Sequence, residues 1–369
     1  MAATTPSDSI HPRVALAGYY DAGNFGDDLS AVLFGLALRR HAIPFSVYGL
    51  CEPYAGQFGF AHAASPDRLL AGAGAFVWGG GGLLVSWSPV TYRLLFPSAA
   101  ARLDRLVRAV TARAIPVMLS SVGGDARPVQ ALTPSYKARL VGAARSITVR
   151  NPEDVDTLKA WGQRAAFFPD IVWGLGQALP LERQRGERLR VGFDLYPSNL
   201  VRQGALQLLP HLQAVVRKRQ DCDFVFIDTT NASRKRYRGL AGLIRGANVS
   251  RYQFRDLGPD LAFVGSLDAV FSSRFHVPIV AMQCGVPAVS VFAERKTRLL
   301  YASLGLEGLS FHHGRIGALL SLLGSRDALD RLTREFPFPD AARLGRDSLG
   351  HVEVLRDALA GSSRCIVWE

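Results

Sequence analysis

The chain has 369 residues, of which 48% are hydrophobic, with 20 Phe and 5 Trp, and this is enough apolar material for the cores of two domains. The 43 basic residues outnumber the 31 acidic ones, and the net charge of +12 predicts a surface that attracts phosphorylated substrates, acidic glycans, anionic lipid or nucleic acid. Four scattered cysteines without a CxxC motif or a histidine cluster argue against a disulfide scaffold or a zinc site, and favour a reducing cytoplasm.

Two segments bear on targeting. Residues 1–12 have no apolar core, so they predict a short disordered leader rather than a signal peptide. Residues 69–89 carry no charge and reach the length of about 18 residues that a membrane span needs. Four consecutive glycines lie in the middle of this stretch, however, and each disfavours a helix by roughly 1 kcal/mol. The stretch therefore predicts a buried strand that runs into a glycine loop.

Short apolar runs alternate with longer amphipathic runs in the first half of the chain. The expected strands are residues 14–17, 45–49, 76–78, 116–120, 146–149 and 166–168. The expected helices are residues 29–41, 66–70, 99–113, 135–144 and 154–161. This alternation predicts an α/β fold with a parallel, doubly wound sheet, whose ligands should lie beyond the carboxyl ends of the strands.

A polar, arginine-rich stretch with Pro180 then interrupts the pattern, which restarts after it. Further strands are expected at residues 190–193, 223–227, 251–254, 269–272 and 288–291, and further helices at residues 204–219, 233–244, 258–266 and 278–284. We therefore predict two Rossmann-like domains that face a cleft. Along the chain we expect a leader (1–12), an N-terminal domain (13–176), a linker (177–189) and a C-terminal domain with a helical tail (190–369).

The junction after the first strand contains Asn24, Asp27 and Asp28 at the start of an apolar helix. It matches neither G-x-G-x-x-G nor a P-loop. The two acids have two readings. They stabilise the amino end of the helix, where negative charge is favoured by about 0.3–1 kcal/mol. Alternatively, together with Asn24, they accept hydrogen bonds from sugar hydroxyls in a cleft.

Two further motifs follow strands of the first domain. Gly79, Gly80, Gly81 and Gly82 form a loop whose backbone N–H groups can approach a ligand closely, although a simple tight turn explains them equally well. Arg150 directly follows a strand and precedes a helix that begins with Pro and acidic residues. It lies where ligand sites form in α/β proteins, and its alternative reading is a solvated surface arginine.

The segment from residue 270 to residue 298 is the most informative in the chain. A strand ends in Ser273, Arg274 and His276, and a helix follows at once. An arginine, a serine and a helix start beside a histidine are what an anion site with a general acid requires. Lys296 follows the next strand and adds positive charge at the same edge. No metal-ligand set, nucleophile elbow or RNA-binding pattern is present in the sequence.

In this order and spacing, the motifs resemble the polysaccharide pyruvyl transferase family over residues 13 to 310. The matching positions are Gly18, Asn24, Gly26, Asp27, Asp28, the run from Gly79 to Gly82, Arg150, the Pro169-Asp170-Ile171 segment, Ser273, Arg274, His276, Gly285, Pro287 and Lys296. The chain departs from the family at three positions. Asp28 stands where Glu is common, Asn151 where Asp commonly follows the arginine, and Phe275 where Leu is usual.

The resemblance implies a GT-B-like fold and a defined reaction. The pyruvyl group of phosphoenolpyruvate is transferred to two hydroxyls of a sugar, which gives a cyclic ketal and free phosphate, with no cofactor and no metal. His276 is then the general acid, and Arg150, Arg274, Lys296 and Ser273 bind the donor. Asn24, Asp27 and Asp28 are assigned to the acceptor. The implied partners are phosphoenolpyruvate and a sugar or lipid-linked oligosaccharide in the cytoplasm, including the inner face of the membrane.

Two alternatives stay open at this stage. A GT-B glycosyltransferase has the same architecture and places the same Arg and His on a nucleotide diphosphate. A non-catalytic family member would bind without turnover. Nucleic-acid binding rests on the net charge alone and is not expected. The acceptor sugar, its reacting hydroxyls and the oligomeric state are not determined by the sequence.

Overall fold

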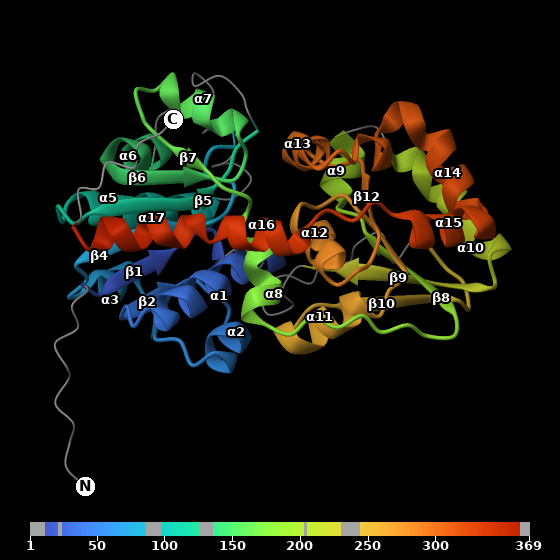
Figure 1. Cartoon of the computed structure of the whole chain (residues 1–369), viewed down its shortest axis with the longest axis horizontal. Helices are drawn as coiled ribbons and strands as arrows, with labels where there is room; N and C mark the ends of the chain where they lie inside the picture. Colours follow the sequence, from blue (N-terminus) through green and yellow to red (C-terminus); the bar gives the residue numbers. More distant parts are fainter. Residues whose placement is uncertain are drawn as a thin grey trace, which may run out of the picture. The chain divides into compact units, whose positions relative to one another are not determined.

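The computed structural model describes residues 12–20, 24–85, 97–125, 136–202, 205–229 and 244–361 (Figure 1). They divide into two compact units. The first unit contains the chain up to Gly174 together with the residues from Gly345 onward, and the second contains Leu175–Leu344. The expected leader, except for Pro12, and nearly all of the expected helix at 233–244 lie outside the described residues.

The first unit is built on a seven-stranded sheet in the order β3-β2-β1-β4-β5-β6-β7, with parallel pairing throughout. Its strands are β1 (Val14–Ala17), β2 (Phe45–Tyr48), β3 (His62–Ala63), β4 (Ala75–Gly79), β5 (Val117–Val122), β6 (Ala144–Val149) and β7 (Ala166–Phe167). The intervening helices are α1 (Phe25–Arg40), α2 (Glu52–Gln57), α3 (Pro66–Leu70), α5 (Pro97–Thr111), α6 (Tyr136–Ala143) and α7 (Glu153–Lys159). The strand order reverses between β1 and β4, which is the topological switch point.

The central strands of this sheet are buried along their whole length, as a parallel sheet covered on both faces requires. Every residue of β1, β4 and β5 is buried. The uncharged stretch of the sequence thus supplies β4 and the glycine loop after it, as predicted. Within the described part of the chain, no helix is both long enough and apolar enough to cross a membrane.

The second unit repeats the same plan with six parallel strands in the order β10-β9-β8-β11-β12-β13. The strands are β8 (Leu189–Asp194), β9 (Cys222–Asp228), β10 (Val249–Gln253), β11 (Ala269–Ser272), β12 (Ala288–Val291) and β13 (Ser310–Phe311). The helices are α8 (Leu175–Ala178), α9 (Pro197–Arg202), α10 (Leu208–Lys218), α11 (Leu257–Gly265), α12 (His276–Gln283), α13 (Arg295–Ser303), α14 (Ile316–Gly324) and α15 (Arg326–Glu335). Here the switch point lies between β8 and β11.

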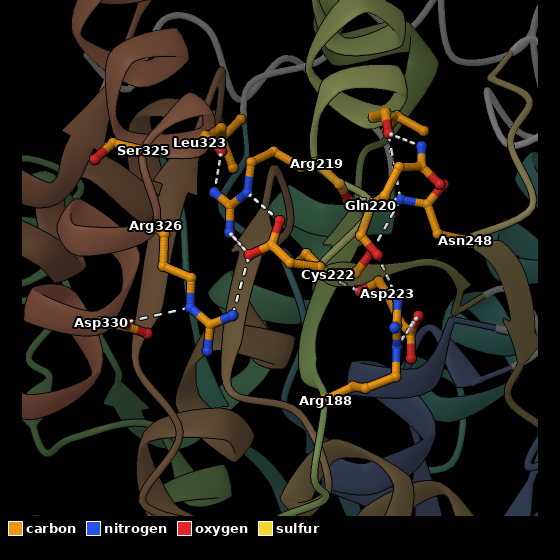
Figure 2. Close-up of polar contacts among 12 residues, drawn as sticks. Arg188, Arg219, Gln220, Cys222, Asp223, Asn248, Leu323, Ser325, Arg326 and Asp330 are labelled. Carbon is orange, nitrogen blue, oxygen red and sulfur yellow. Dashed lines mark hydrogen bonds and ion pairs between the residues drawn. The ribbon is translucent and has the colours of Figure 1, made fainter.

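A polar network closes the amino-terminal edge of the second sheet (Figure 2). Arg219, at the end of α10, donates two hydrogen bonds to Asp221, from Nε to Oδ1 over 2.8 Å and from Nη2 to Oδ2 over 3.0 Å. It also donates to the carbonyl oxygen of Leu323 over 3.1 Å. Arg326 of α15 donates to Asp221 Oδ2 over 3.2 Å. The network therefore fastens α14 and α15 to the loop between α10 and β9.

The prediction of an α/β fold with two Rossmann-like domains and parallel sheets is confirmed. The last part of the domain assignment needs a correction, because α17 (Gly350–Leu359), which follows α16 (Ala341–Ser348), belongs to the first unit. Figure 1 shows α17 in red beside the strands of that unit, and it packs against β5 and β6. Its buried side chains His351, Val354, Leu355 and Leu359 form one stripe at i, i+3, i+4 and i+8.

Candidate active site

The junction after β1 places three of the predicted residues at the carboxyl edge of the first sheet. Asn24 has extended backbone angles (φ −99°, ψ 116°), so α1 begins at Phe25, earlier than the predicted residue 29. The Asn24 side-chain amide donates to Asp27 Oδ2 over 2.7 Å. Asp27 is 8% exposed and Asp28 is fully buried. Both acids lie in the first turn of α1, so both can stabilise the amino end of this helix through their negative charge. Only Asp27 reaches the surface.

The glycine loop after β4 packs directly against this first turn. Gly80 and Gly81 have φ values of +74° and +81°, which favour glycine. A Cβ atom on Gly81 would lie 2.9 Å from the Tyr19 ring and 3.3 Å from Asp27 Oδ1. Tyr20 donates its hydroxyl proton to the carbonyl oxygen of Gly79 over 2.6 Å, and burial raises the pKa of this hydroxyl. The two predicted motifs therefore form one continuous edge.

Arg150 follows β6 at the same edge, but its guanidinium is inside the protein. Its Nη1 donates to Asp170 Oδ2 over 2.7 Å, and both side chains are 1% exposed. The side chain lies against Gly123, where a Cβ atom would collide with it, and Gly123 N donates to the carbonyl oxygen of Gly81 over 3.0 Å. The solvated surface arginine is thus excluded, and Arg150 forms a buried ion pair behind the glycine loop.

A buried histidine that the sequence left unassigned joins α17 to this region. His351 Nε2 lies 3.0 Å from the carbonyl oxygen of Pro169, which only accepts, so Nε2 carries the proton. Nδ1 then accepts from Thr148 Oγ1 over 2.7 Å, and Thr148 Oγ1 in turn accepts from Ser121 N over 3.0 Å. Burial lowers the pKa of His351 to about 4, so the imidazole is neutral at pH 7.

Asn151, one of the departures from the family pattern, helps to hold the loop at the end of β5. Its side-chain amide donates to Asp154 Oδ2 over 2.8 Å. Gly124 N donates to the same oxygen over 2.6 Å. Burial raises the pKa of Asp154 to about 6, although both hydrogen bonds lower it. An aspartate at position 151 would not donate this bond, so the asparagine suits a buried carboxylate neighbour.

The second unit places Ser273, Arg274 and His276 at its switch point. Ser273 is 1% exposed, and its hydroxyl accepts from Tyr196 N over 2.6 Å and donates to the carbonyl oxygen of Asp194 over 3.3 Å. This hydroxyl therefore orders the loop. His276 is the first residue of α12, 7% exposed, and its ring meets that of Phe275 edge-on at 5.0 Å.

Arg274 lies between Ser273 and His276 in the sequence and is half-buried. The carbon at the centre of its guanidinium lies 4.5 Å from the centroid of the Tyr196 ring. Lys296, in the first turn of α13 after β12, forms an ion pair of 3.1 Å with Glu294. Since β12 is the neighbour of β11, Lys296 and Arg274 follow adjacent strands. Both cations therefore lie at the same edge of the second sheet, where Lys296 is already paired with a carboxylate.

Asp194, which the sequence analysis did not single out, lies at the centre of this edge. It ends β8 as the register partner of Ser272 on β11. Its Oδ2 accepts from Ser272 Oγ over 2.8 Å and its Oδ1 from Thr229 Oγ1 over 3.3 Å. Burial raises the pKa of Asp194, against the opposing charge of Arg274. The rule that selected Arg274, a polar residue at the end of an apolar strand, also selects Asp194.

The structure thus yields two groups of residues, each within its own unit. Asn24, Asp27, the glycine loop and Arg150 are together in the first, while Asp194, Ser273, Arg274, His276 and Lys296 are together in the second. Among the described residues, no group of three or more His, Cys, Asp or Glu side chains is arranged to hold a metal ion. The first group lies along the carboxyl edge of its sheet from the switch point between β1 and β4 as far as β6. The second group lies at and next to the switch point between β8 and β11, the kind of place where such folds bind their ligands.

Two Rossmann-like units of this kind define the class of GT-B-like proteins, and solved structures agree. The putative UDP-N-acetylglucosamine 2-epimerase of Listeria monocytogenes is similar with a TM-score of 0.64 at 12% identity, over 96% of this chain and 98% of its own. The UDP-GlcNAc 2-epimerase of Neisseria meningitidis, bound to UDP-GlcNAc, gives 0.57 at 11% identity over 94% and 100%. Identities this low show the shared fold alone.

The sequence itself matches the model of the polysaccharide pyruvyl transferase family over residues 24–293, which is most of the chain. The chain belongs to the polysaccharide pyruvyl transferase family. No curated protein sequence matches it. The matched range includes all the candidate residues from Asn24 to His276 and leaves Lys296 outside.

Proposed function

We propose that the protein transfers the pyruvyl group of phosphoenolpyruvate to two hydroxyls of a sugar in a polysaccharide or its precursor. The observation that carries this proposal is the presence of both Arg274 and His276 directly after β11, at the switch point of the second sheet, in a chain of this family. Phosphoenolpyruvate presents a carboxylate and a phosphate on one small frame. A guanidinium matches either group with two parallel hydrogen bonds.

In the proposed reaction, His276 protonates the methylene carbon of phosphoenolpyruvate and leaves an oxocarbenium-like centre at C2. One sugar hydroxyl attacks C2, the C–O bond to phosphate breaks, and the second hydroxyl closes the ketal. Of the two protons that the hydroxyls lose, one restores His276 and the other is taken up by the departing phosphate. A general acid of this kind accelerates a reaction by about 10²- to 10⁴-fold. The reaction requires no redox change, and we assign no metal or cofactor to it.

The acceptor side is assigned to the first unit. Asn24 and Asp27 border the glycine loop, and their amide and carboxylate are suited to sugar hydroxyls. Asp28 is fully buried and supports the turn beneath them. Lys296 is proposed to add positive charge to the donor site of the second unit, although it already pairs with Glu294. Arg150 lies in the first unit with its guanidinium buried against Asp170, so its role as a donor ligand is a separate proposal. A lipid-linked acceptor at the inner face of the membrane is compatible with the basic surface.

The test is phosphate release from phosphoenolpyruvate with a panel of galactosides, glucosides and mannosides. We expect acceptor-dependent release by the wild type and a loss of at least about 100-fold in His276→Ala. The matched control is His211→Ala, which removes an exposed histidine of α10 in the same unit and should retain full activity.

The absence of release with every acceptor would be resolved by calorimetry. Phosphoenolpyruvate that still binds would mean that the acceptor panel is wrong. Phosphoenolpyruvate that does not bind would overturn the donor assignment, and nucleotide-sugars would then be tested as donors for a GT-B glycosyltransferase reaction.

A further inference from the structure

The guanidinium of Arg274 is held by an aromatic ring. Its central carbon lies 4.5 Å from the centroid of Tyr196, within the roughly 6 Å range of a cation–π contact. The Nε atom is buried and has no hydrogen-bond partner among the residues that the structure describes. Stacking of this kind fixes the plane of the guanidinium and leaves its edge, where the N–H donors are, for a ligand.

The segment that carries Tyr196 is bonded to the segment that carries Arg274. Tyr196 N donates to Ser273 Oγ over 2.6 Å, and Asn199 Nδ2 donates to the carbonyl oxygen of Ser273 over 2.9 Å. Ser273 N donates to the carbonyl oxygen of Asp194 over 2.9 Å. The loop after β8 and the loop after β11 are thus joined at Ser273, the residue that precedes Arg274.

The backbone of Arg274 is fixed from the same side. Its N–H group donates to Ser272 Oγ over 3.0 Å, and Ser272 Oγ donates to the buried Asp194 carboxylate over 2.8 Å. Asp194 is 3% exposed. Both the main chain and the side chain of Arg274 therefore depend on the end of β8. A cation that is already oriented loses less conformational freedom when an anion binds, which strengthens binding.

We propose that Tyr196 is a positioning residue of an anion site in the second unit, whose ring holds Arg274 in the orientation that binds the anionic donor. The identity of the donor, phosphoenolpyruvate, rests on the proposed function. The existence of the anion site rests on the geometry of Tyr196, Ser273 and Arg274. The two parts are therefore tested with different ligands.

The variants are Tyr196→Leu, which removes the ring, and Tyr196→Phe, which keeps it. Calorimetry with phosphoenolpyruvate and, separately, with UDP gives the dissociation constants, and phosphate release gives KM and kcat. We expect Tyr196→Leu to weaken phosphoenolpyruvate binding by about 3- to 30-fold. KM should rise in parallel while kcat changes little, and Tyr196→Phe should bind like the wild type.

A double-mutant cycle separates this role from a general loss of structure. In an Arg274→Ala background the Tyr196→Leu substitution should cause no further loss of affinity, because the ring acts only through the guanidinium. If Tyr196→Leu does not fold, Tyr196→Met replaces it in the same cycle, since methionine has a similar reach and no ring.

Each outcome decides the positioning role, the donor assignment or both. Unchanged affinity in Tyr196→Leu, or equal losses in the Leu and Phe variants, would overturn the positioning role. Wild-type binding of UDP but not of phosphoenolpyruvate, weakened in Tyr196→Leu, would overturn the donor assignment and support the positioning role. Failure of the wild type to bind either ligand would overturn both.

Discussion

The buried ion pair between Arg150 and Asp170 raises the question whether Arg150 stabilises the fold or binds the donor. Both side chains are 1% exposed, and their contact is 2.7 Å long. Removing one partner of such a pair leaves an uncompensated buried charge. We therefore expect Arg150→Leu to lower the free energy of unfolding by about 3–5 kcal/mol, measured by denaturant titration.

The double variant Arg150→Leu/Asp170→Leu provides the control. It removes both charges and should regain much of the lost stability. If this folded variant binds phosphoenolpyruvate as tightly as the wild type, Arg150 is not a donor ligand. A stable Arg150→Leu variant with weakened donor binding would instead contradict the structural role.

His351 predicts how stability depends on pH. Burial lowers its pKa to about 4, below the ordinary value near 6.5. Between these values the unfolded chain binds a proton that the folded chain does not. The contribution of His351 is therefore complete above pH 6.5 and is lost as the pH falls to about 4, by an amount of order 3 kcal/mol. Urea titrations at several pH values measure it.

The pH dependence of the wild type must be compared with that of His351→Gln, because Asp154 titrates in the same pH range and changes the unfolding free energy in the opposite direction. Burial raises the pKa of Asp154 to about 6, so its protonation stabilises the folded chain as the pH falls. Glutamine keeps one donor and one acceptor and has no titration. An identical pH slope in this variant and the wild type would show that His351 does not carry the effect.

The predictable residues are those that follow an apolar strand. Arg150, Arg274 and His276 could be found by this rule, since a parallel sheet collects such positions at one edge. Their partners could not be found, because Asp170 meets Arg150 and Tyr196 meets Arg274 only through tertiary packing. The burial of Asp28 depends likewise on an early helix start that periodicity did not reveal.

At the level of elements, the network of Figure 2 predicts an asymmetric response to mutation. Arg219 is 5% exposed and donates two hydrogen bonds to Asp221, so Asp221→Asn should cost about 1–3 kcal/mol of unfolding free energy. Arg326 bonds the same carboxylate, but its side chain is 54% exposed, so Arg326→Gln should cost less than about 1 kcal/mol. Thermal unfolding of both variants measures these costs. Equal losses of unfolding free energy in the two variants would contradict the stabilising role of Arg219.

The same carboxylate has a pH signature. The hydrogen bonds from Arg219 lower the pKa of Asp221 to about 2. Its contribution to stability should therefore be present above about pH 4 and be lost as the pH falls toward 2. NMR titration of the Asp221 carboxyl carbon measures this value directly, and an ordinary midpoint near 4 would contradict the bidentate geometry.

The strands that match their predicted bounds are short runs in which every residue is buried. β1, β11 and β12 lie where the sequence predicted them. The helix expected from residue 204 begins instead at Leu208, with Pro210 in its first turn, where proline is tolerated. β13 has two residues, Ser310 and Phe311, and owes its pairing with β12 to the sheet, so no local signal could predict it.

For the whole molecule, the position of α17 predicts that the two units respond differently to truncation. A chain that ends at residue 348 lacks the stripe that covers β5 and β6. We expect hydrogen exchange to show lost protection of β5 and β6, while β8 and β11 in the second unit stay protected. A chain that ends at residue 361 is the control and should resemble the wild type. Equal loss in both units would contradict this division.

The return of the chain to the first unit also sets an order of events during synthesis. The second unit is one uninterrupted stretch, Leu175–Leu344, so it has all of its residues before translation ends. The first unit has made its last strand by residue 167, yet it must wait for α17 to cover β5 and β6. Nascent chains usually complete their amino-terminal domain first. Here the earlier unit lacks its covering helix until every residue of the later unit has been synthesised.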